Sequence, residues 1–198
     1  MDLDQSHRPL SRSQARRVVL VAGLSALVVG GLTSIARAAD VRASEYQIKA
    51  AYLCKFATYI EWPTASASDA TVPIVIGVIA SDAVAAEMAN TLQGQSVGGR
   101  PIVVRRIDAH GRLDGLNILF IARTHAAHVS EALAALQGRP VLTVTELDAP
   151  GDSSSMVNFI VIDDKVKFDV ALPPVVHSGL KISSRLLAVA HVVTGRDS

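Results

Sequence analysis

Histidines are the first residues here whose type and spacing could support chemistry. His125 and His128 lie three residues apart in a segment with a helical pattern, so both imidazoles could point the same way. Two histidines without a neighbouring carboxylate or thiol make a weak metal site, and a surface or capping role is the simpler interpretation. His110, His177 and His191 show no ligand-like spacing. The sequence therefore predicts no metal site.

Serines are the next candidates, because the segment GDSSSM (Gly151–Met156) contains three in a row. A hydrolase would need Ser154 or Ser155 as its nucleophile. The G-x-S-x-G pattern is missing, and the segment lacks the strand-turn-helix setting of a nucleophile elbow. A loop is the expected structure, and a hydrolase is the weakest of the functions considered.

A bound nucleotide would require glycines at a strand-to-helix turn. The first such turn reads VIASDAVAA, with neither G-x-G-x-x-G nor G-x-x-x-x-G-K-[ST]. Gly94, Gly98 and Gly99 precede a predicted strand, which is the wrong end for a phosphate at a helix N-terminus. We expect no cofactor and no catalytic residues.

The N-terminal region has the pattern of an export signal. Arginines precede the apolar run Val18–Leu32, and Ala36-Arg37-Ala38 offers an A-x-A cleavage site. We expect residues 1–38 to be a cleaved signal peptide and residues 39–198 to be one periplasmic domain. A retained anchor is the alternative, but about 20 apolar residues are needed for a comfortable span. Arg16-Arg17 leaves the choice between general secretion and twin-arginine export open.

Cleavage would change the charge balance. It removes five of the 19 basic and two of the 18 acidic residues, leaving 14 against 16 and a net charge of −2. No basic cluster with interleaved aromatics remains, so nucleic-acid binding is not expected. The single cysteine, Cys54, excludes an internal disulfide. Stability must therefore come from packing.

Strand and helix patterns alternate along the rest of the chain. Helices are predicted over 44–61, with Ser44 as N-cap, over 81–94, capped by Ser81, and over 124–138, capped by Thr124. Buried strands are expected over 73–80, 101–107, 117–122 and 140–146, a hairpin over 156–172 with Asp163-Asp164 at its turn, and a terminal helix over 173–193 that is interrupted around Ser178-Gly179. The alternation predicts a three-layer α/β/α sandwich with a mostly parallel sheet and an antiparallel hairpin at one edge.

The first helix carries the only tryptophan, in KAAYLCKFATYIEWP (Lys49–Pro63). Helical spacing places Ile48, Tyr52, Phe56, Tyr59 and Ile60 on one apolar stripe, predicted to face the core. Lys49 interrupts that stripe and is expected to extend its ammonium to solvent. Cys54 falls on the opposite face with Ala50 and Ala57, and nothing nearby predicts a reactive thiol. Trp62 either contacts a partner or covers the end of the sheet.

Four stretches together resemble the YfiR family of periplasmic regulators: KAAYLCKFATYIEWP, GGRPIVVRRI (Gly98–Ile107), NILFIA (Asn117–Ala122) and MVNFIVIDDKVKFDVALPPVVHSGLKISSRLL (Met156–Leu187). The resemblance implies a non-catalytic exported domain, often dimeric, that binds the periplasmic sensory domain of an inner-membrane diguanylate cyclase and represses cyclic di-GMP synthesis. Contact with the membrane would then come only through this partner. Better-known relatives carry cysteine pairs, and their absence here argues against redox sensing through such pairs.

The family resemblance also suggests contact residues. The face near the last strand and the turn into the terminal segment is implicated in partner or effector contact, which corresponds to Phe168, Asp169, Lys181 and Ser183. With Trp62, these are the predicted partner- or effector-binding residues. A small-ligand receptor that uses a crevice at the carboxyl edge of the sheet is the alternative function.

Overall fold

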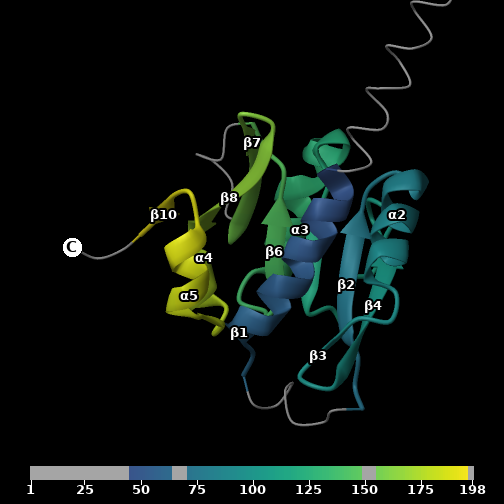
Figure 1. The fold of residues 1–198 in the computed structure, drawn as a ribbon, viewed down its shortest axis with the longest axis horizontal. Helices are drawn as coiled ribbons and strands as arrows, with labels where there is room; N and C mark the ends of the chain where they lie inside the picture. The colour runs from purple at the N-terminus through teal and green to yellow at the C-terminus, as the bar shows by residue number, and fades with distance from the viewer. Residues whose placement is uncertain (1–44, 64–70, 149–154, 196–198) are drawn as a thin grey trace, which may run out of the picture. The chain divides into compact units, whose positions relative to one another are not determined.

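The protein is built around a central sheet. A computed structural model describes residues 45–63, 71–148 and 155–195, and within them eight strands follow the order β10-β8-β7-β6-β5-β2-β4-β3 (Figure 1). Four neighbouring strands at its centre run parallel: β4 (Arg100–Arg106), β2 (Ile74–Ile79), β5 (Ile118–Ile121) and β6 (Leu142–Thr145). The strands predicted from the apolar runs are therefore present, and they pair as expected for an α/β fold.

The outer strands make the sheet mixed. β7 (Val157–Ile162) runs parallel to β6 and antiparallel to β8 (Lys165–Ala171), forming the predicted hairpin. Asp163 and Asp164 form its turn with φ of 51° and 58°, as a type I′ turn requires. The two-residue strands β3 (Ser96–Val97) and β10 (Val193–Thr194) flank the sheet.

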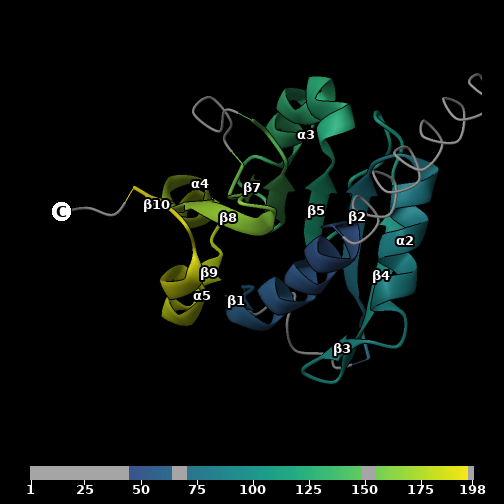
Figure 2. The ribbon, with the colours of Figure 1, turned by 45° about the horizontal axis from the view of Figure 1, so that its top comes forward.

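Helices cover both faces of the sheet. In β5, Ile118 and Phe120 belong to one apolar cluster, whereas Leu119 and Ile121 belong to the other. The first cluster contains the helix over 45–59 and α2 (Asp82–Leu92), and the second contains α3 (Val129–Leu136) (Figure 2). The predicted three-layer α/β/α sandwich is therefore confirmed.

The helix over 81–94 is present as α2, and its predicted cap is confirmed. The Ser81 hydroxyl accepts a hydrogen bond from the Val84 amide at 3.4 Å. The prediction over 124–138 is only partly right, because a 3₁₀ segment, η2 (Arg123–His128), precedes α3. His125 has non-helical dihedrals (φ −117°, ψ 22°), which break the helix. Thr124 is therefore not the N-cap; its hydroxyl instead lies 2.9 Å from the His125 ring.

The terminal helix is also divided, at the predicted position. α4 (Leu172–His177) ends before Gly179, whose φ of +73° suits glycine. The chain then forms β9 (Lys181–Ile182) and α5 (Ser184–Val189). Its last part is not helical as predicted, because Val193 and Thr194 pair with β8 as β10.

The first helix ends at Tyr59, earlier than predicted, because Ile60 and Glu61 form β1 against β9. Its predicted cap, Ser44, lies outside the described residues. The predicted buried stripe is rotated, with Ile48 exposed and the core side made by Lys49, Ala50, Leu53, Phe56, Ala57 and Ile60. The large apolar Leu53, between Ala50 and Phe56, decides which face is buried. Lys49 does not reach solvent, contrary to expectation.

Candidate functional site

The β1–β9 pair brings three of the five predicted contact residues to one place. Glu61 lies opposite Lys181 in this antiparallel pair, and the Ser183 amide donates to the Tyr59 carbonyl at 2.9 Å. Trp62 directly follows β1. The Ser183 hydroxyl accepts from the Arg185 amide at 3.3 Å and so caps α5. Residues more than a hundred positions apart thus form one local structure.

Trp62 has an unusual indole. Its side chain is partly exposed and packs against the first apolar cluster. Its Nε1, however, is buried and has no hydrogen-bond partner among the described residues. A buried donor without a partner costs about 1–3 kcal/mol. A small rearrangement that offered this N–H an acceptor would therefore be favourable.

Phe168 and Asp169 lie apart from the β1–β9 pair, on β8. The Phe168 ring is buried (2% exposed), with its centroid 5.0 Å from that of Phe56 and 5.6 Å from that of Tyr52. A partner could therefore touch Phe168 only if the residues around it moved. Otherwise Phe168 would affect binding only through the residues that pack against it. Asp169 instead reaches the segment after α5, where its carboxylate lies 3.0 Å from Nδ1 of His191.

Apolar side chains are exposed on the same C-terminal part of the chain. Val176 on α4 is 74% exposed, Val189 at the end of α5 is 68% exposed, and Val192 before β10 is 42% exposed. In Figure 1 these elements lie together at the hairpin side of the sheet. We use the name C-terminal surface for these three valines together with four of the predicted contact residues, Trp62, Asp169, Lys181 and Ser183.

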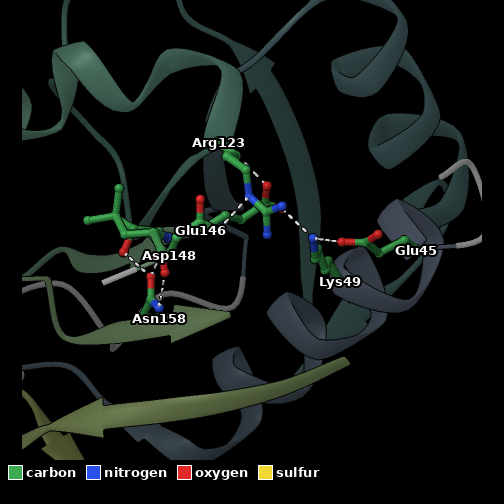
Figure 3. A network of polar contacts seen from close by, with 8 residues as sticks. Glu45, Lys49, Arg123, Glu146, Asp148 and Asn158 are labelled. Carbon is green, nitrogen blue, oxygen red and sulfur yellow. Dashed lines mark hydrogen bonds and ion pairs between the residues drawn. The ribbon is translucent and has the colours of Figure 1, made fainter. Parts of the chain in front are cut away.

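A second polar centre lies at the carboxyl ends of β5 and β6 (Figure 3). The Lys49 ammonium lies 2.7 Å from the Glu146 carboxylate, with both side chains almost fully buried, and it also pairs with Glu45. The other Glu146 oxygen accepts from the Arg123 amide at 3.1 Å. Buried charges persist only when they are paired and hydrogen-bonded, so this network fastens the first helix to the sheet.

The neighbouring loop is fixed by Asn158 of β7. Its side-chain oxygen accepts from the Leu147 amide at 2.8 Å and from the Thr145 hydroxyl at 2.9 Å, while its side-chain nitrogen donates to the Leu147 carbonyl at 3.0 Å. Together these bonds hold the chain directly after β6. The carboxyl end of these strands is thus occupied by structural polar contacts.

Two nearby groups have shifted pKa values. Burial, with a smaller effect from the Glu146 and Glu45 carboxylates and a hydrogen bond to Glu146, raises the pKa of Tyr46 to about 12. Burial also raises the pKa of the Cys54 thiol, an effect only partly opposed by the cation of Lys55. A raised pKa lowers the thiolate fraction, so Cys54 has the character of an unreactive thiol.

A groove of about 680 Å³ lies between α3 and α4. Leu133 and Leu147 contribute to its apolar lining, and Ser130 and His177 provide polar groups. Its volume is in the range of small-molecule pockets. This groove opens beside α3 and reaches Leu147, just after the carboxyl end of β6. A ligand crevice at the carboxyl edge of the sheet stays a prediction.

The serines and histidines that the sequence offered as candidates for chemistry lie in different settings. Ser155 is buried, with its hydroxyl 2.9 Å from that of Thr145, and Ser154 lies outside the described residues. The ring centroids of His125 and His128 are 6.4 Å apart. His110, distant in sequence, lies closer to His128, at 5.2 Å. Sequence spacing alone could not reveal this approach, although Glu131, three residues after His128, was a visible signal.

Comparisons with known proteins identify the family of this chain. No helix among the described residues is long and apolar enough to cross a membrane. A search of curated proteins finds no match. The model of the YfiR/HmsC-like family matches residues 46–191, which include the C-terminal surface except Val192 and the polar network around Lys49 except Glu45. The chain therefore belongs to the YfiR/HmsC-like family, a family of periplasmic regulators that act with membrane diguanylate cyclases and are in general not catalytic.

Proposed function

We propose that this protein binds the periplasmic sensory domain of an inner-membrane diguanylate cyclase and represses cyclic di-GMP synthesis. Family membership over residues 46–191 is the observation that carries this proposal. In this account residues 1–38 are a signal peptide, and residues 39–198 act as one domain in the periplasm. The N-terminal residue of the periplasmic form, measured by mass spectrometry, should be Ala39.

The C-terminal surface is the proposed contact with the cyclase. Interfaces depend on a few apolar or aromatic anchors surrounded by polar groups, and tryptophan is prominent among such anchors. Here Val176 and Val189 supply exposed apolar area, while Lys181 supplies a charge at the rim. The indole N–H of Trp62, which has no hydrogen-bond partner within the part of the chain that the structure describes, adds a donor that partner binding could satisfy after a local rearrangement.

Repression requires the protein to bind the inactive cyclase more tightly than the active one. Only a difference in affinity between two states can shift their equilibrium. Moving the cyclase from equal populations to 99% inactive needs about a 100-fold preference, or about 2.7 kcal/mol. A few well-packed anchors can supply this free energy.

A pull-down from bacterial membranes tests the contact. The exported protein should retain a membrane diguanylate cyclase, and Val189→Glu should reduce the amount retained by placing a charge in an apolar contact. Val103→Glu is the matched control, because Val103 is also exposed (45%) but lies on β4, away from the C-terminal surface. Equal retention by both variants would contradict a contact at Val189.

The groove between α3 and α4 favours a second candidate, a small-ligand receptor. An amino acid or a vitamin would fit the groove's volume and its mixed lining. A ligand in the groove should raise the melting temperature of the protein, and Leu133→Trp, which fills the groove, should abolish that rise. A thermal-shift screen of such compounds with no response at millimolar concentration would reject this candidate.

A homodimer is also consistent with the proposed function. Two copies could meet through exposed apolar residues such as Val176 and Val189. Light scattering of the purified protein at several concentrations would report the mass. If Val189→Glu converts a dimer to a monomer, this surface takes part in self-association. The pull-down would then be repeated with a variant that alters the surface without changing the oligomeric state.

A further inference from the structure

Two histidines and a glutamate converge next to the start of α3. His110 comes from the loop after β4, His128 from the end of η2, and Glu131 from the first turn of α3. One ligand atom from each of the three lies within 4.8 Å of the other two. Nδ1 of His110 lies 3.2 Å from a carboxylate oxygen of Glu131.

This separation is close to that of two ligands on one metal ion. With metal–nitrogen and metal–oxygen distances near 2.1 Å, ligand atoms at tetrahedral angles are about 3.4 Å apart. The His110 and Glu131 side chains are 71% and 64% exposed, so both can rotate to close the remaining distances. His128 is half-buried and fixed at the junction of η2 and α3, and it would provide the anchored ligand.

We propose that His110, His128 and Glu131 bind a divalent transition-metal ion of the zinc type. Imidazole nitrogens combined with a carboxylate suit Zn²⁺ and its neighbours, whereas Mg²⁺ and Ca²⁺ prefer sites made of oxygens. Three protein ligands leave one position open for water or for a group from another molecule. The ion would link the loop after β4 to the start of α3, on the α3 side of the sheet.

The site differs from the histidine pair suggested by spacing. His125 neighbours His128 in sequence, but its Nδ1 lies 2.9 Å from the Thr124 hydroxyl. It does not belong to the group of converging ligand atoms. His125 and the distant His177 are therefore matched control positions, because each is a histidine outside the proposed site.

Isothermal titration of the full chain, expressed without an affinity tag, with Zn²⁺ alone tests the proposal. We expect one Zn²⁺ per chain, no comparable heat with Mg²⁺, and a higher melting temperature when Zn²⁺ is present. His110→Ala and Glu131→Gln should each weaken binding at least about tenfold, because losing even an outer-shell partner typically costs 10–100-fold. His125→Ala and His177→Ala should bind as the unchanged protein does.

Three results would overturn the proposal. The first is that the unchanged protein binds no Zn²⁺ at a metal concentration of about 0.1 mM, at which even a weak site would be occupied. The second is unchanged affinity in both His110→Ala and Glu131→Gln, with folding confirmed by circular dichroism. The third is a loss in His125→Ala as large as that in His110→Ala, which would assign the ion to the sequence-adjacent pair. None of these results bears on cyclase binding.

Discussion

The Lys49 ammonium lies 2.7 Å from the Glu146 carboxylate, and the side chains are 1% and 2% exposed. The pair joins the first helix to the residue directly after β6, two parts of the chain almost a hundred residues apart. Glu45 and the Arg123 amide provide further partners, so each charge has more than one. The two buried ions are therefore mutually dependent.

Removing one member of this pair should destabilise the protein strongly. Lys49→Met leaves the Glu146 charge buried without its cation, which typically costs about 3–5 kcal/mol. Adding Glu146→Gln should recover much of that loss, because the amide oxygen still accepts from Arg123 without carrying a charge. Urea unfolding of both single variants and the double variant measures this coupling. Additive losses would show that the two charges are not coupled.

Tyr46, beside this pair, should lose its proton at a higher pH than an ordinary tyrosine. The stability of the folded protein should therefore depend on pH in the alkaline range. Its pKa is about 12 in the folded protein, above the ordinary value of 10, so the folded state keeps a proton that the unfolded chain loses. Stability should therefore fall as pH rises from 10 towards 12. The ultraviolet absorbance of tyrosinate, followed as pH rises, should show one component that titrates near pH 12.

The matched variants separate Tyr46 from the other two tyrosines. Tyr46→Phe should remove the late component of the titration and weaken the fall in stability. Tyr59→Phe should leave the late component in place. A late component that persists in Tyr46→Phe would contradict the burial of this hydroxyl beside Glu146.

The hairpin turn should be improved by glycine. Asp163 and Asp164 both have positive φ, a conformation that costs residues with a side chain more than it costs glycine. Asp164→Gly should therefore stabilise the protein by about 0.5–1 kcal/mol, after subtraction of the greater freedom of glycine in the unfolded chain. A lower unfolding midpoint in urea for this variant would show that the Asp164 side chain makes a compensating contact.

Cys54 should react slowly with alkylating reagents. Because burial raises its pKa, less thiolate is present at a given pH than in a free cysteine. Iodoacetamide at pH 8 should modify Cys54 more slowly than it modifies cysteine in a short peptide, and Cys54→Ser should bind the cyclase as the unchanged protein does. Faster modification than in the peptide would indicate an activated thiol and reopen a redox role.

The sequence predicts most of the fold because the central strands are continuous apolar runs. Ile74–Ile79 and Ile118–Ile121 can be buried on both faces only in a covered sheet. Ser81 as a cap and Asp163-Asp164 as a turn follow equally from local chemistry. Such features are decided within a few residues, which is why they are visible without the structure.

What the sequence does not reveal depends on distant residues. The pattern around Lys49 indicates a solvated lysine, because its partner Glu146 lies in another part of the chain. β1 exists only through β9, so the first helix looks two residues longer than it is. His110 joins His128 and Glu131 through the packing of a loop, and no spacing rule covers that approach.

Repression of a diguanylate cyclase by direct contact in the periplasm is the proposed function of this protein. Its most direct test is the cellular concentration of cyclic di-GMP in a strain that lacks the protein and is complemented in turn with the unchanged form, Val189→Glu and Val103→Glu. The proposed repression predicts a high concentration without the protein, a low one with the unchanged form or Val103→Glu, and a high one with Val189→Glu. An unchanged concentration after deletion, in a cell that contains the membrane cyclase, would contradict it.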